Sequence, residues 1–201
     1  MKRILKWLGL VLLALIGIPA LALLCVAGYY YHVVWQKPGA LSTPITPTVL
    51  GSKVNVFSGT GGYAWVCAYD TPAACVPFGM VRLGPDTATI ITNETGYNAS
   101  GYFYGDNKIV GFSHTRLVGA DALEGGIFRV FPATKPRGAL KEPEFSRFAH
   151  RKETGFPGYY AVQLSDVLAE MTATTRVGVH RYTFSKGTTP HLRLDVTSAL
   201  G

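Results

Sequence analysis

The sequence predicts an all-β domain, folded as a β-sandwich, that follows one N-terminal transmembrane helix. Two observations support this prediction: an almost uninterrupted apolar run from Trp7 to Tyr31, and several later stretches in which apolar and polar residues alternate. Beyond the apolar run, no window of about 12 residues shows the 3.6-residue period of an amphipathic helix. The 23 glycines and 12 prolines fit many short strands joined by tight turns.

The apolar run is expected to be a retained membrane anchor within residues 1–36. At roughly 1.5 Å per residue it can cross a hydrocarbon core of about 30 Å. A cleaved signal peptide is the alternative, because Ala20-Leu21-Ala22 resembles a cleavage site, but the run exceeds the usual apolar region of about 7 to 15 residues. Lys2, Arg3 and Lys6 precede it and are expected to stay in the cytoplasm, which places the β domain on the exported side, periplasmic or extracellular.

The rest of the chain divides into a spacer and one domain. Residues 37–52 contain three prolines and are expected to form an extended spacer, and residues 53–201 have the length of a single domain. Without the three cations of the membrane flank, 16 basic residues stand against 12 acidic ones, a net charge of +4. These basic residues are scattered singly, so nucleic-acid binding has little support.

Five segments after the anchor have strand patterns, and two others read as turns. The expected strands are residues 76–83, 126–131, 160–164, 176–184 and 192–196, and the expected turns are residues 155–158 and 185–190. Only Thr197 to Gly201 follow the last strand, which leaves that strand without a covering element. We therefore expect this chain to be the N-terminal part of a longer protein.

The segment 111–126, GFSHTRLVGADALEGG, has the composition of a binding loop, with an ordinary surface loop as the alternative. It sets His114, Arg116, Asp121 and Glu124 among glycines, which argues against a core strand or a regular helix. Three of these side chains have ligand chemistry, but no second histidine or cysteine is nearby, so no metal is assigned. The two carboxylates are also poorly suited to catalysis, because a flexible loop does not fix their separation.

Aromatic and cysteine residues leave two pairs of alternatives. Tyr97 and the run Tyr102 to Tyr104 lie just before this loop, and their rings either pack against sugars or fill the interior of the sandwich. Cys67 and Cys75 either form a disulfide in an oxidising compartment or remain as two small buried thiols.

Six short motifs, in the same order along the chain, resemble the N-terminal domain of the glycoside hydrolase family 92 α-mannosidases. They are Val54 to Gly62, Ala74 to Thr87, Ser100 to Tyr104, Gly111 to Thr115, Pro157 to Tyr160 and Leu168 to Gly178. Each is weak alone, and their shared order is what makes a chance resemblance unlikely. The segment after Thr115 departs from the commoner family pattern His-Leu-Ser-Gly-Thr-Gly, which leaves the linkage preference open.

The resemblance implies an exported, calcium-dependent exo-α-mannosidase that trims mannose from N-glycans or mannan with inversion of configuration. Such enzymes join an N-terminal β-sandwich to a larger C-terminal helical domain, which holds the catalytic carboxylates and the calcium ligands. That domain is expected to lie outside these residues, so no catalytic residue is assigned and the fragment alone is expected to be inactive.

By the same resemblance, this part of the enzyme supplies one wall of the sugar site and an interdomain surface. The expected partners are a mannose-containing glycan and the missing C-terminal domain, and the residues proposed for sugar binding are Tyr97, His114, Arg116, Asp121 and Glu124. The alternative is a non-catalytic, membrane-anchored module that binds carbohydrate or another partner.

Overall fold

The computed structural model describes residues 2–34, 37–39, 41–62, 69–88, 100–118, 125–135 and 145–198. The chain forms two compact units, Met1–Trp35 and Gln36–Gly201. The first unit is the helix α1 (Lys2–Val34), in which Lys6–Tyr29 forms a stretch of 24 residues with a mean hydropathy of 2.9. This stretch is long and apolar enough to cross a membrane. A signal sequence near an N-terminus has the same properties, so the helix fits either role.

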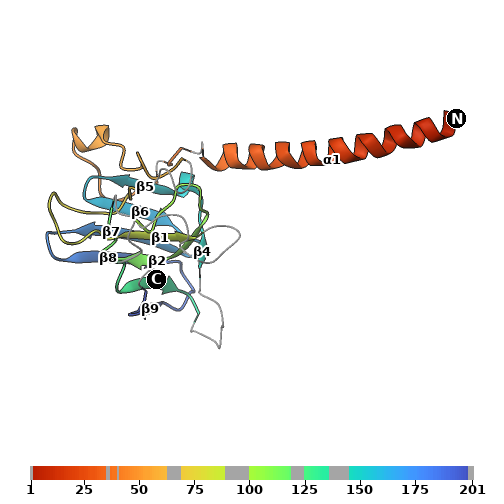
Figure 1. Ribbon diagram of the computed structural model, residues 1–201. Coiled ribbons are helices and arrows are strands. Elements are labelled where there is room, and N and C mark those ends of the chain that lie inside the picture. Colours follow the sequence, from red (N-terminus) through yellow and green to blue (C-terminus); the bar gives the residue numbers. More distant parts are fainter. Residues whose placement is uncertain are drawn as a thin grey trace. The chain divides into compact units, whose positions relative to one another are not determined.

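The second unit is built from two antiparallel sheets (Figure 1). The first sheet has the order β1 (Gly84–Ala88), β2 (Lys108–Ser113), β3 (Arg129–Ala133), β9 (His191–Asp195), with β4 (Ser146–Arg147) also paired to β2. The second has the order β5 (Glu153–Phe156), β6 (Tyr159–Gln163), β7 (Val167–Ala173), β8 (Gly178–Phe184). Two short 3₁₀ helices complete the described elements, η1 (Gly51–Lys53) and η2 (His150–Lys152). The prediction of an all-β sandwich after one apolar helix is confirmed.

Four of the five predicted strands are present. Residues 160–164, 176–184 and 192–196 correspond to β6, β8 and β9, and the strand predicted at 126–131 begins three residues later, as β3. The predicted strand 76–83 is wrong for most of its length. Its first residues form a turn closed by Gly79 N–H donating to Val76 O at 3.0 Å, and only Arg82 and Leu83 make isolated bridges before β1.

The loop 111–126 also differs from its prediction at its first residues. Gly111, Phe112 and Ser113 are the second half of β2, and every residue of that strand is buried. A core strand is possible here because Gly111 lets the Arg129 side chain pack against the backbone: a Cβ atom at Gly111 would lie 2.4 Å from Cγ of Arg129. Glycine in this motif therefore marks close packing as well as a loop.

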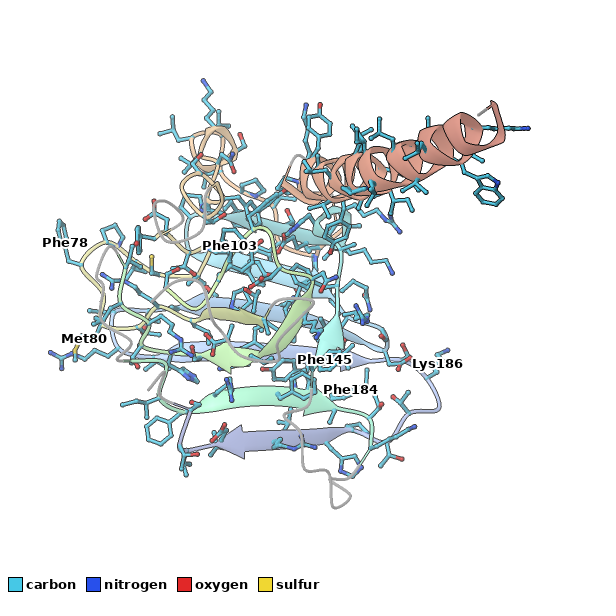
Figure 2. The ribbon with its side chains drawn as sticks, turned by 45° about the vertical axis from the view of Figure 1, so that its right-hand side comes forward. Phe78, Met80, Phe103, Phe145, Phe184 and Lys186 are labelled. Carbon is cyan, nitrogen blue, oxygen red and sulfur yellow. The ribbon has the colours of Figure 1, made fainter. Side chains whose placement is uncertain are left out.

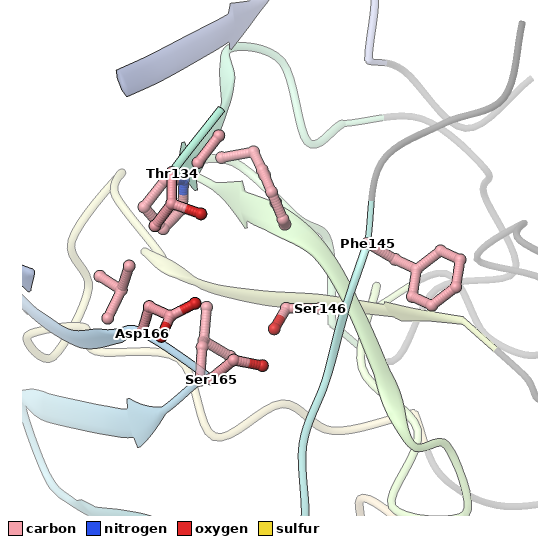
Figure 3. Close-up of a pocket in the computed structure, with 10 residues that line it drawn as sticks. Thr134, Phe145, Ser146, Ser165 and Asp166 are labelled. Carbon is pink, nitrogen blue, oxygen red and sulfur yellow. The ribbon is translucent and has the colours of Figure 1, made fainter. Parts of the chain in front are cut away.

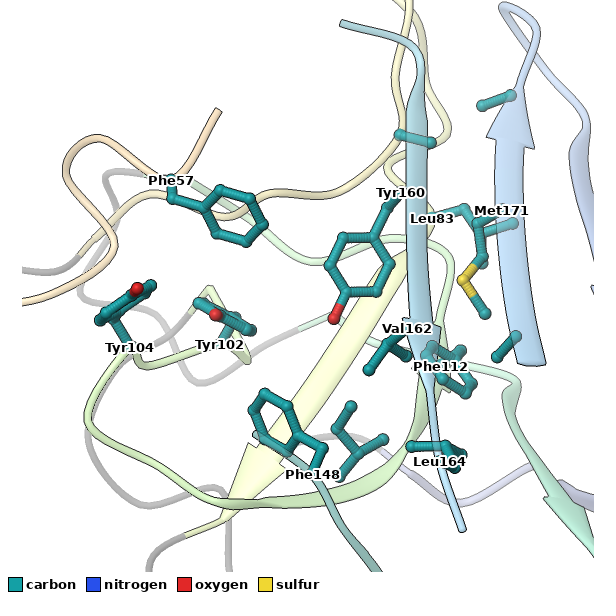
Figure 4. Close-up of a cluster of buried hydrophobic side chains, with 14 of the residues drawn as sticks. Phe57, Leu83, Tyr102, Tyr104, Phe112, Phe148, Tyr160, Val162, Leu164 and Met171 are labelled. Carbon is teal, nitrogen blue, oxygen red and sulfur yellow. The ribbon is translucent and has the colours of Figure 1, made fainter. Parts of the chain in front are cut away.

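The core lies between the two sheets and is rich in aromatic rings (Figure 4). Phe57 packs against Tyr102, Tyr104 and Tyr160, with ring centroids 6.2 to 6.5 Å apart. Leu83, Phe112, Val162 and Met171 extend this cluster along the strands. The core interpretation of the run Tyr102 to Tyr104 is therefore confirmed, because all three side chains are at most 8% exposed.

The segment predicted as a spacer contacts the sandwich. Gly39 N–H donates to His150 O at 2.9 Å, and Thr43 forms a side-chain hydrogen bond with Tyr159. Residues of this segment, among them Leu41 and Ser52, line a cavity of about 490 Å³ together with Thr154, Gly155 and Phe156 of β5. These contacts place the described part of the spacer against the second sheet.

Candidate functional site

One end of the sandwich gathers the described part of the predicted binding loop and its neighbours. Gly84 at the start of β1 pairs with Ser113 at the end of β2, and Phe112 pairs with Val130 of β3. The chain therefore enters β1, leaves β2 and enters β3 at the same end. The β7–β8 turn reaches this end as well, because Thr175 O accepts a hydrogen bond from Met80 N–H at 2.8 Å.

His114 is the predicted site residue that the structure places at this end. Its Nδ1 lies 2.9 Å from Phe128 O, and its Nε2 lies 2.9 Å from Nε2 of His180. Since a carbonyl oxygen only accepts, Nδ1–H of His114 is the donor, and in a neutral His114 ring Nε2 then accepts from Nε2–H of His180. The other nitrogen of His180 then accepts from the Tyr182 hydroxyl at 2.7 Å. These bonds form one chain of hydrogen bonds that runs from Phe128 O through the two histidines to Tyr182.

Burial keeps His180 and Tyr182 uncharged near neutral pH. Burial, with a smaller contribution from neighbouring His114, lowers the pKa of His180 from 6.5 to about 4. Burial likewise raises the pKa of Tyr182 well above its ordinary range. The arrangement is therefore suited to holding the rings and the Phe128 carbonyl in place, and a positively charged histidine is not expected at His180 near pH 7.

Arg116 lies inside the loop and is only 3% exposed. Its Nε donates to Asp86 Oδ1 at 2.8 Å and its Nη1 donates to Gly125 O at 2.9 Å. Gly126 covers the guanidinium so closely that a Cβ atom there would lie 2.0 Å from Cζ. These contacts brace the two ends of the described loop against β1. Sugar binding by Arg116 stays a prediction, and this burial does not favour it.

Four other predicted positions lie outside the described residues. They are Tyr97, Asp121, Glu124 and Cys67. Their roles in sugar binding, and the pairing of Cys67 with Cys75, therefore stay predictions. Cys75 itself is exposed, so the alternative of a buried thiol is wrong for this residue.

His180 is a neighbour of the loop that the sequence analysis missed. It lies 66 positions after His114, and its strand pattern gives no sign that its ring turns toward the loop. Alternation along 176–184 does place His180 and Tyr182 on the same face of one strand. This shared face is the sequence signal that points to His180. It identifies a site residue only once the segment that packs against that face is known.

A separate cavity of about 170 Å³ lies where β3 and β6 end, at the opposite end of the strands (Figure 3). Its lining includes the polar residues Thr134, Ser146, Ser165 and Asp166 together with Phe131 and Phe145. His114 and Arg116, the two predicted sugar-binding residues that the structure describes, do not line it.

Comparison with known proteins agrees with this architecture. Residues 53–201 match the model of the glycosyl hydrolase family 92 N-terminal domain. A search among curated proteins found none that matches the chain.

Three solved structures show the relationship in more detail. A family GH92 α-mannosidase from Bacteroides thetaiotaomicron, BT3965, is 34% identical over 75% of this chain, with a TM-score of 0.62. The GH92 family glycosyl hydrolase ccman5 is also 34% identical, over 74% of this chain, with a TM-score of 0.62. The inverting mannosidase BT2199 from B. thetaiotaomicron VPI-5482 is 24% identical over 71% of this chain, with a TM-score of 0.53, and shows the shared fold alone.

The chain spans 20% of the length of ccman5 and of BT3965, and 19% of the length of BT2199. The family match covers more than half of the chain, and the order of motifs and the two-sheet fold agree with it. The chain therefore belongs to glycoside hydrolase family 92, through its N-terminal domain.

Proposed function

We propose that this chain is the N-terminal sandwich of an exported, calcium-dependent exo-α-mannosidase, which trims mannose from N-glycans or mannan with inversion. The observation that carries the proposal is the match over residues 53–201, together with 34% identity to a solved α-mannosidase. Because the chain spans about one fifth of that relative, hydrolysis is assigned to the whole enzyme and only a part of the sugar site to this chain.

Two fully buried carboxyl groups of the sandwich, Asp86 and Glu153, are unsuited to catalysis. An inverting glycosidase needs two carboxyl groups about 6.5 to 9.5 Å apart, one on each side of the sugar. Asp86 is held by Arg116 and Ser113, and Glu153 accepts from Tyr102, Tyr160 and His150. Both are fully buried, so neither can reach a glycosidic bond. The sandwich is proposed to orient the sugar and to exclude water from one side.

Calcium is proposed to bind outside this chain. Among the described residues, no group of three or more His, Cys, Asp or Glu side chains is arranged to hold a metal ion. Calcium prefers six to eight oxygen ligands, and the two buried carboxylates named above already accept hydrogen bonds from protein donors. These residues do not fit a calcium site, and no step is assigned to the ion here.

The helix α1 is proposed to anchor the protein, with Lys2, Arg3 and Lys6 in the cytoplasm and the sandwich on the exported side. The apolar stretch Lys6–Tyr29 and this positive flank support that orientation. A retained helix would keep the sandwich close to the membrane surface.

An assay on the purified full chain in detergent micelles tests the proposed division of labour. The chain is expected to release no mannose from α-linked mannobiose, with or without calcium, and to bind methyl α-mannoside weakly. Binding is followed by saturation-transfer NMR, with a β-galactoside as the control sugar. Calcium-dependent release of mannose would show that the catalytic groups lie in this chain, and a lack of any mannoside signal would refute the sugar-site role.

A further inference from the structure

Two phenylalanines adopt a backbone conformation that bulky side chains rarely take. Phe78 and Phe128 both have φ of 58°, and among the described residues they are the only ones other than glycine with positive φ. Steric contact of Cβ with the backbone disfavours this region for L-residues. Both rings are also exposed, Phe78 fully and Phe128 by 53%, so packing in the described core does not account for either of them.

Phe78 occupies the tip of a tight turn. Gly79 N–H donates to Val76 O at 3.0 Å, which places Pro77 second and Phe78 third in a four-residue turn. With proline second and positive φ third, this is a type II turn, whose third position favours glycine. Met80 N–H donates to Thr175 O at 2.8 Å and ties the turn to the β7–β8 turn. Phe78 and Met80 therefore project from a fixed backbone at the edge of the molecule (Figure 2).

The backbone at Phe128, just before β3, is also held by hydrogen bonds. Its carbonyl accepts from His114 Nδ1–H, at the end of the hydrogen-bond chain that runs through His180 to Tyr182. The next residue, Arg129, donates its N–H to Ser198 Oγ at 3.1 Å. Both polar groups of the peptide bond between Phe128 and Arg129 are thus bonded to side chains of the sandwich.

The two phenylalanines belong to the same end of the fold and have polar neighbours. His114 is bonded to the segments that carry both of them. Its carbonyl accepts from N–H of Arg82, four residues after Phe78, at 2.8 Å, and its ring donates to Phe128 O. His114 and Arg82 are partly exposed, and Thr175 beside the Phe78 turn is exposed. Apolar rings that alternate with hydrogen-bonding groups suit a carbohydrate, which has C–H faces bordered by hydroxyls.

We propose that Phe78 and Phe128 are sugar-contacting residues, whose exposed rings pack against the C–H faces of an α-mannoside. This inference rests on the proposed function and names the contact residues of that site. Strain of this kind persists where the surrounding structure fixes it, and it is concentrated at ligand-binding positions. The proposal replaces the aromatic run Tyr102 to Tyr104, which is buried, as the source of the aromatic surface.

The test compares the wild-type chain with Phe78→Gly and Phe128→Gly in detergent micelles, using methyl α-mannoside as the probe in saturation-transfer NMR. Each variant is expected to bind the mannoside about threefold to tenfold more weakly, as expected for the loss of one aromatic contact. Glycine suits positive φ, so the melting temperature is expected to stay the same or rise. The control is Phe145→Ala, which removes a partly exposed ring near β4 and is expected to leave binding unchanged.

The outcomes separate this inference from the proposed function. If the wild-type chain gives no mannoside signal, the proposed sugar site fails and this inference fails with it. If the wild-type chain binds and both glycine variants bind equally well, only the assignment of Phe78 and Phe128 is overturned. Unchanged mannoside binding with reduced self-association in the variants would instead identify the two rings as protein contacts. Weaker binding with a marked fall in melting temperature would indicate a structural role and would also overturn the proposal.

Discussion

Glu153 is a charged residue at the centre of the packed interior. It is fully buried and accepts hydrogen bonds from the hydroxyls of Tyr102 and Tyr160, each at 2.8 Å, and from His150 Nδ1. Burial and the neighbouring Glu153 raise the pKa of Tyr102 and of Tyr160 well above the ordinary range, so both hydroxyls remain donors. Burying a carboxylate is costly, and these three donors compensate for that cost.

Removing the Glu153 side chain is expected to destabilise the sandwich strongly. In Glu153→Ala three buried donors lose their acceptor and a cavity forms, which should lower the free energy of unfolding by about 3 kcal/mol. Urea denaturation followed by circular dichroism in micelles measures this change. Asp166→Ala, at an exposed carboxylate, is the control and should change stability by less than about 0.5 kcal/mol. A similar small loss in both variants would contradict the role given to Glu153.

Asp106 and His180 are expected to make opposite contributions to the pH dependence of stability. Burial raises the pKa of Asp106 from 3.8 to about 7, and burial lowers the pKa of His180 from 6.5 to about 4. As pH rises from about 4 to 6.5, the unfolded chain loses the proton that it carried on His180, which favours folding. Over the same range folded Asp106 keeps a proton that unfolded Asp106 has lost, which disfavours folding.

Single variants should reveal these two opposing slopes. In Asp106→Asn, which keeps an acceptor for Thr87, stability should rise with pH relative to wild type between about pH 4 and 6.5. In His180→Gln it should fall with pH relative to wild type. One proton changes stability by at most about 1.4 kcal/mol per pH unit. Urea denaturation at several pH values measures the slopes, and equal slopes in the two variants would show that these groups do not titrate as described.

For single residues, the sequence predicts which side chains lie at the site better than it predicts the residues that they contact. His114 was identified as a site residue from its loop, and the structure does place it in a hydrogen-bond chain at the loop end of the sandwich. Its partner His180 and the ion pair of Arg116 with Asp86 join residues 66 and 30 positions apart. Such pairs depend on how the strands are ordered, which composition and spacing do not reveal. The strained φ of Phe78 was likewise hidden, because glycine would be the usual residue there.

Among the elements, β8 and β9, whose exposure alternates, are predicted from the sequence, whereas β1 and β2, which are buried throughout, are not. Residues of β8 and β9 alternate between more and less exposed positions, and both strands were identified. Every residue of β1 and of β2 is buried, so neither has a polar face to give a period of two. In β2 the polar residues Lys108 and Ser113 are buried beside apolar ones, which hides the strand further.

Turn chemistry explains a further difference between the predicted and the observed elements. The turn predicted at residues 155–158 is half right: Gly155 and Phe156 end β5, and Pro157 and Gly158 join it to β6. Pro77-Phe78-Gly79 was assigned to a strand because apolar residues surround it, although proline followed by a position with positive φ produces a turn. Where a turn carries an exposed aromatic ring in place of glycine, apolar content alone is a poor guide to strand structure.

In the whole molecule the two sheets do not cover each other completely. Phe112 pairs with Val130 and Val130 pairs with Leu194, so these three side chains lie on the same face of the first sheet. The Phe112 ring lies 6.1 Å from that of Tyr182 in the second sheet and is buried, which makes this the inner face. Yet Leu192, Leu194 and Val196 are 59 to 64% exposed, because the second sheet ends at β8 in the described residues.

This uncovered part of the inner face is expected to make the isolated chain self-associate. Contiguous exposed apolar surface promotes association, and two leucines at its centre are its main contacts. The full chain in detergent micelles should form dimers or larger species at micromolar concentrations, as measured by sedimentation velocity. The double variant Leu192→Thr, Leu194→Thr should associate at least about tenfold more weakly. Both side chains are exposed and threonine suits a strand, so folding should be retained.

Val179→Thr, at an exposed apolar residue of β8 in the other sheet, is the control and should associate like wild type. A wild-type chain that stays monomeric and melts sharply would instead show that the face is stable in water, and would count against its being one side of an interface with the rest of a family 92 enzyme.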